Sequence, residues 1–113
     1  MPDTINTYFE KWNADQKLSF IEFFTHELTL CIRSIWADEI LTSLNKVEQI
    51  KWINEIILHM PMIAYALRMG KETWNGSDVA CIIEKYLTQD NRIRSLVESA
   101  IEYSIQHVTG EYK

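Results

Sequence analysis

The stretch ILHMPMIAYALRMG, residues 57–70, contains few polar side chains, and its spacing decides how the chain folds. On a helical projection at about 100° per residue, the segment 50–69 presents one broad apolar face. That face is formed by Ile53, Ile56, Ile57, Met60, Ile63 and Leu67. Steps of three and four residues are typical of a helix that packs against other helices. We therefore expect an all-α protein in which this helix contributes to the core.

A second apolar stripe runs along the other side of the same segment. It consists of Leu58, Met62, Tyr65 and Met69. A helix that is apolar all round is usually buried all round, yet a helix in a small bundle buries only one broad face. The outer side is polar earlier in the segment, at Lys51, Asn54 and Glu55, so the change begins near residue 59. Pro61 cannot donate a hydrogen bond to the carbonyl of Ile57, which predicts a bend or break there.

The first long helix shows a similar excess of apolar residues. Phe23 and Leu30 lie outside its main seam and widen its apolar arc to roughly 240°. The seam itself consists of Ile21, Phe24, Leu28, Cys31 and Ile35. Three coverings are open for the surplus faces: a short N-terminal helix, a second copy of the chain, or an apolar ligand in a pocket. An irregular fold that buries the second stripe internally is a fourth possibility.

Capping signals divide the chain into a short N-terminal helix and four principal helices. The expected helical segments are 3–12, 13–36, 45–67, 75–87 and 90–109. The expected caps and stops are Asp3, Asn13 with Gln16, Asn45 with Glu48, Gly70, Asn75, Asp90 and Gly110. Trp74 is expected to pack on Val79 as a hydrophobic staple. With short connections, this order predicts a single domain, 1–113, folded as a four-helix bundle, either up-and-down or orthogonal.

Composition excludes several classes of protein. The chain has 113 residues, of which 47% are hydrophobic, with three glycines and two prolines, so neither disorder nor an all-β fold is expected. The net charge is −5 and no basic stripe is present, which argues against nucleic-acid binding. The longest apolar run, 60–67, is far shorter than the ~20 residues of a membrane span, and the start of the chain does not resemble a secretory signal. With only two cysteines, far apart, we expect a cytoplasmic protein with free thiols.

Two pairs, Glu22 with His26 and Glu55 with His59, have a carboxylate and an imidazole one helical turn apart. Di-metal bundles use inward-facing Glu-x-x-His motifs, but the spacing here is one residue longer. The projection also places both pairs off the core seams. We therefore expect surface pairs, with no metal and no other cofactor.

Catalytic motifs are not found in the sequence. Cys31 falls on a core seam, where thiols behave as small hydrophobic groups, whereas Cys81 falls off the apolar stripe of its helix. His107 lies on the apolar face of the last helix and is expected at the core or its boundary. Neither cysteine sits beside a recognisable base and orienting group, so we expect no enzyme activity.

The sequence therefore predicts a small protein that acts by binding. The favoured hypothesis is a non-catalytic interaction or regulatory domain that forms a homodimer through apolar helix faces. The expected interaction residues are Leu58, Met62, Tyr65, Met69, Phe23 and Leu30. One alternative is an apolar ligand held among Met60, Met62, Tyr65 and the tryptophans. Another is an inhibitor or accessory protein of a larger enzyme or toxin, because methionine-rich surfaces can adapt to different partners.

Overall fold

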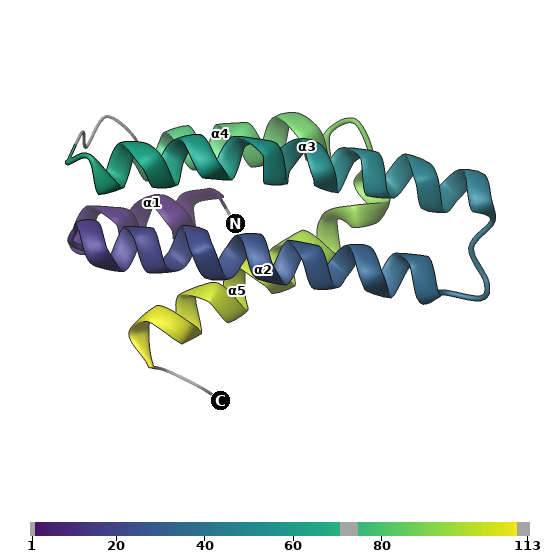
Figure 1. The fold of residues 1–113 in the computed structure, drawn as a ribbon, viewed down its shortest axis with the longest axis horizontal. Coiled ribbons are helices and arrows are strands. Elements are labelled where there is room, and N and C mark those ends of the chain that lie inside the picture. The colour runs from purple at the N-terminus through teal and green to yellow at the C-terminus, as the bar shows by residue number, and fades with distance from the viewer. Residues whose placement is uncertain (1, 71–74, 111–113) are drawn as a thin grey trace.

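Two long antiparallel helices form the frame of the protein, as the computed structural model shows (Figure 1). The structure describes residues 2–70 and 75–110, without the side chains of residues 2–4. In these segments the elements are α1 (Pro2–Lys11), α2 (Ala14–Ala37), α3 (Ser43–Arg68), α4 (Gly76–Leu87), the 3₁₀ turn η1 (Asn91–Ile93) and α5 (Arg94–Thr109). The all-α prediction is confirmed, and the order of the helices agrees with a four-helix bundle preceded by a short helix.

The remaining helices pack on the α2–α3 hairpin. In Figure 1, α4 lies behind α3, and α5 runs obliquely from behind α2 until its C-terminal end stands clear of the hairpin. Helix α1 contacts α4 and adds the aromatic side chain of Phe9 to the core, with Tyr8 packed against it. The rings of Phe9 and Phe20 meet edge to face with centroids 5.6 Å apart, and Phe20 stacks on Phe24. A helix of this length is marginal by itself, so docking of its aromatic face stabilises it.

The contact between α1 and α4 requires a glycine. A Cβ atom added to Gly76, the first residue of α4, would lie only 2.3 Å from the Cα of Asn6. No side chain fits such a gap, so the two backbones approach this closely only because residue 76 has none.

Most helix ends follow the capping pattern of the sequence. Asn13 and Gln16 form the expected reciprocal pair of hydrogen bonds, at 2.9 and 3.0 Å. Asn75 caps α4 and pairs in the same way with Asp78. The last helix ends at Gly110, whose φ of +74° is a left-handed conformation that favours glycine, and Gly70 after α3 has a φ of +70°.

Several expected boundaries are wrong. Helix α3 begins at Ser43, because the hydroxyl of Thr42 accepts a hydrogen bond from the Asn45 amide, so the pair Asn45 and Glu48 does not form the cap. Helix α1 begins at Pro2, which places Asp3 within it. Asp90 caps the η1 turn, and α5 starts only after that turn. The expected staple from Trp74 lies outside the described residues.

Helix α3 continues through Pro61 without interruption, so of the predicted bend or break the break does not occur. The missing amide of a proline removes one hydrogen bond, and the flanking turns retain theirs. Buried neighbours hold the helix on both sides of the proline: Met60 is 1% exposed and Ile63 is fully buried. Packing of the inner face therefore outweighs the local preference for a helix end.

Candidate interaction surface

The second apolar stripe of α3 is an exposed row on the outside of the protein. Leu58, Met62, Tyr65 and Met69 are exposed by 69%, 62%, 60% and 57%. Their steps of four, three and four residues keep them on one side of the helix, opposite Ile56 and Ile63, which are both fully buried. We call these four residues the outer row. The single chain therefore leaves the outer row uncovered, and the row is not part of its core.

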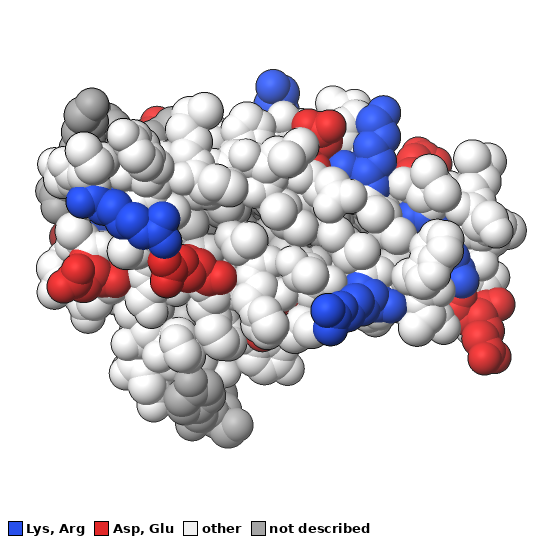
Figure 2. Space-filling model, in the orientation of Figure 1, with Lys and Arg blue, Asp and Glu red and all other residues white. Residues whose placement is uncertain are grey.

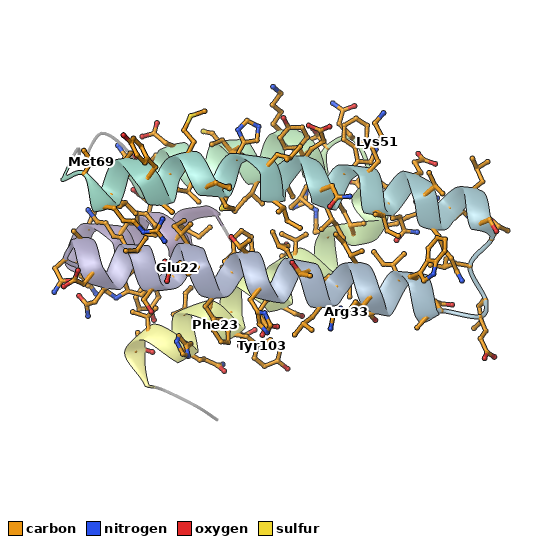
Figure 3. All side chains as sticks on the ribbon, viewed as in Figure 1. Glu22, Phe23, Arg33, Lys51, Met69 and Tyr103 are labelled. Atoms are coloured by element: carbon orange, nitrogen blue, oxygen red, sulfur yellow. The ribbon has the colours of Figure 1, made fainter. Side chains whose placement is uncertain are left out.

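The same side of α3 carries further exposed apolar residues near the start of the helix. Leu44 and Val47 are 75% and 57% exposed and fall on the line of the outer row. Lys51 and Asn54 separate them from it, and Figure 3 shows Lys51 on the side of α3 turned away from α2. The Lys51 ammonium lies 4.7 Å from the centre of the Trp52 ring. The outer side of α3 is thus apolar at both ends and polar in the middle.

Phe23 and Leu30 do not join the outer row. Figure 3 shows Phe23 beside α5, on the side of α2 away from α3, with Tyr103 close by. Leu30 is 39% exposed and lines a shallow groove between α2 and α5 together with Tyr103. Phe23 is half-buried. The six predicted interaction residues therefore belong to two separate surfaces.

His107 is exposed, so its expected place at the core or boundary is wrong. Its imidazole stacks on Phe23 with ring centroids 4.1 Å apart and an interplanar angle of 9°. The stacking explains why a histidine stands on the apolar face of α5: its ring covers part of Phe23 while its edge reaches water.

One member of each carboxylate–histidine pair bonds to another helix. Glu22 pairs with Arg68 of α3, and both side chains are more than half exposed. An exposed pair of this kind contributes about 0–1 kcal/mol. His59 shares a 2.9 Å hydrogen bond with the Tyr86 hydroxyl of α4. Among the described residues, no group of three or more His, Cys, Asp or Glu side chains could hold a metal ion.

The two cysteines lie in different surroundings. Cys31 is half-buried, with its sulfur 3.8 Å from the Leu96 carbonyl oxygen. The pKa of its thiol is raised mainly by burial and also by the nearby Glu27 carboxylate. Cys81 is exposed on α4. Both thiols are free, as the sequence predicts.

A polar cluster around η1 was not predicted. Asp90 is buried, and its carboxylate accepts hydrogen bonds from the backbone amide and the guanidinium of Arg92. The same guanidinium donates to Asn45 at 2.8 Å and lies 3.1 Å from Glu48. The hydrogen bond from Arg92 is the main reason that the pKa of Asp90 is lowered, and these carboxylates raise the pKa of Arg92. The order Asp-Asn-Arg at residues 90–92 could have indicated the local pairing of Asp90 with Arg92. The contacts of Arg92 with Asn45 and Glu48 depend on the fold, which brings α3 beside η1.

The residues proposed to hold an apolar ligand point in different directions. Met60 is buried in the core, whereas Met62 and Tyr65 are exposed in the outer row. Trp12 is buried, Trp36 is 62% exposed, and Trp52 is half-buried; Trp74 lies outside the described residues. The structure therefore does not bring these side chains together around one space.

The electrostatic pattern of the front face is uneven. Figure 2 shows charged side chains near the left end and towards the right of this face, with a broad uncharged area between them.

None of the described helices has the length and apolar character that a membrane span requires. A comparison with protein-family models, curated proteins and solved structures finds no match to this chain.

Proposed function

We propose that the protein acts by binding, and that its first partner is a second copy of itself, which covers the outer row of α3. The observation that carries this proposal is the exposure of all four side chains of the row by more than half. Burying a large apolar side chain contributes about 1.5–3 kcal/mol, so leaving four in line exposed forgoes a substantial gain. Contiguous apolar surface of this kind is a common mark of a protein-binding site.

The spacing of the outer row favours self-pairing. Its steps of four, three and four residues read the same in both directions. A twofold axis between Met62 and Tyr65 therefore places Leu58 of one copy opposite Met69 of the other, and Met62 opposite Tyr65. An interface of this type is isologous, since each residue meets its partner twice. Two antiparallel α3 helices with this register form the proposed dimer.

The proposed dimer leaves a role for a further protein. Methionine side chains adapt to differently shaped surfaces, so the outer row also suits the apolar helix of an enzyme or toxin that this chain regulates. We further propose that the protein has no catalytic activity, binds no nucleic acid and uses no cofactor. The free thiols agree with a reducing cytoplasm as the place of action.

The test of the proposal is the substitution Met62→Glu. We expect the protein to remain helical but to become monomeric, because a carboxylate there is solvated in the single chain and would be desolvated in the dimer, at a cost of several kcal/mol. Sedimentation velocity gives the mass and far-ultraviolet circular dichroism gives the helix content. A wild-type protein that is monomeric at high micromolar concentration would exclude the dimer.

The matched control is Tyr103→Glu. Tyr103 is 56% exposed, about as much as Met62, but lies on α5 beside α2. We expect this variant to remain a dimer. If Tyr103→Glu dissociates the dimer and Met62→Glu does not, the interface lies at α2 and α5 instead.

The register can be tested separately by cross-linking. In a Cys81→Ser background, the double variant Met62→Cys/Tyr65→Cys is expected to form a disulfide-linked dimer under mild oxidation. The single variant Leu58→Cys should cross-link poorly, because its opposite residue is Met69. Equal cross-linking of both proteins would contradict the antiparallel register.

A further inference from the structure

A cavity of about 310 Å³ that is open to solvent lies where η1 and the start of α5 meet the α2–α3 hairpin. Its walls include apolar side chains from three parts of the chain, Ile35, Leu41 and Leu96. Asp38 also lines the cavity, and its carboxylate accepts hydrogen bonds from the Ile40 and Leu41 amides, at 2.8 and 3.2 Å. This volume is at the lower end of the range for small-molecule sites.

Gln49 of α3 lines the same cavity and is the least expected residue in it. The side chain is only 4% exposed and stands four and seven residues before the fully buried Ile53 and Ile56. It therefore occupies an apolar position of the inner face of α3, on the side away from the outer row. Buried amides in proteins are normally hydrogen-bonded, and glutamine is rare at such positions.

The Gln49 amide has no hydrogen-bond partner within the described part of the chain. Every fully buried side-chain nitrogen or oxygen in the described part of the chain has a hydrogen-bond partner. Because the Gln49 amide atoms have none, they are not fully buried, and the small exposed area of this residue includes them. Gln49 lines the cavity, so its amide is next to open space. Its N–H groups and its carbonyl oxygen are thus presented together to whatever fills the cavity.

The charges around the cavity select against an anion. Arg92 lines the cavity, but its guanidinium is already bound by the carboxylates of Asp90 and Glu48. Asp38, which lines the cavity, adds a third carboxylate nearby. A carboxylate or phosphate ligand would therefore meet an excess of negative charge. A cation would satisfy the Gln49 oxygen but leave the amide N–H groups without a partner when water is displaced.

We propose that this cavity binds a small neutral molecule with an N–H donor next to a carbonyl acceptor, as on the edge of a lactam ring. Such an edge forms two antiparallel hydrogen bonds with the Gln49 carboxamide and satisfies both of its halves. The ring faces then contact Ile35, Leu41 and Leu96. This site is separate from the outer row, so binding does not depend on dimer formation.

The experiment compares uracil, which has the lactam edge, with 1,3-dimethyluracil, which keeps the ring and carbonyls but has no N–H donor. Binding is followed through the side-chain NH₂ signals of Gln49 in ¹⁵N-correlated spectra of the full chain. We expect saturable shifts with uracil and binding at least about tenfold weaker with the dimethyl compound. No saturable shift with uracil, or equal binding of both compounds, would overturn the proposal.

The variant Gln49→Leu provides the second measurement. Since the Gln49 amide makes no hydrogen bond within the described chain, the variant is expected to unfold at the same temperature as the wild type or higher, and to lose uracil binding at least about tenfold. Backbone signals of Leu96 report on the cavity in both proteins. Undiminished binding in the variant would overturn the role of Gln49, and a lower unfolding temperature would overturn the premise that its amide is kept for a ligand.

Discussion

The inner and outer faces of α3 are made of the same kinds of residue but have opposite surroundings. Met60 is 1% exposed and Met62, two residues later, is 62% exposed. The inner face is covered because α2 and α4 pack against it, and the outer row is left in water. Hydrophobic composition therefore does not identify the core of this protein. The phase of each residue on the helix and the positions of the neighbouring helices identify it.

The largest effect is expected from a charged side chain placed in the inner face of α3. Ile53 is fully buried, so in Ile53→Glu the new carboxylate would lie in the core without a partner. We expect the variant to lose its folded structure, since an unpaired buried charge costs about 3–5 kcal/mol and a small domain has only about 5–15 kcal/mol in total. Circular dichroism and thermal denaturation measure this loss. A cooperative transition within a few degrees of the wild type would show that Ile53 can reach solvent.

A smaller effect on the free energy of unfolding is expected when each of the two methionines is truncated to alanine. Met60→Ala removes buried methylene groups and leaves a cavity, so it is expected to lower the free energy of unfolding by about 2–4 kcal/mol. Met62→Ala is expected to change it by less than about 0.5 kcal/mol in dilute, monomeric protein. Urea denaturation at low micromolar concentration gives both values.

The same pair distinguishes folding from association. At high protein concentration Met62→Ala should become destabilising relative to the wild type, because dimer formation adds to the stability of the dimeric protein. If Met60→Ala and Met62→Ala cost the same in dilute protein, the two faces do not differ as their exposure indicates.

Local patterns were sufficient for most of the fold. The capping box of Asn13 and the stop at Gly110 depend on neighbouring residues only, and both were predicted. The width of the apolar arc indicated more apolar surface than one helix face can bury, but whether the outer row was buried internally was left open, and the structure shows it exposed. Of the bend or break predicted at Pro61, the break does not occur, because packing against other helices holds the turn together, and such packing is not visible in local sequence.

Long-range contacts account for the parts of the site that sequence did not predict. Phe23 could not be assigned to a separate surface until α5 was placed beside α2. The Arg92 cluster combines residues nearly half the chain apart, since Asn45 and Glu48 belong to α3. Nothing in the local sequence marks Gln49 as buried, and the approach of η1 and α5 places it beside a cavity.

The smallest expected effect extends the comparison of covered and uncovered faces to the two thiols. We expect Cys81 to react with an excess of 5,5′-dithiobis(2-nitrobenzoate) at pH 7.5 at least about tenfold faster than Cys31. Cys81 is exposed, whereas Cys31 is half-buried and its thiol pKa is raised by burial and by Glu27, which reduces the reactive thiolate. The single variants Cys31→Ser and Cys81→Ser assign each phase, and denatured protein sets the rate for full access. Equal, slow labelling in the native protein would mean that the face of α4 carrying Cys81 is covered in solution, and the search for a second interface would then move to that helix.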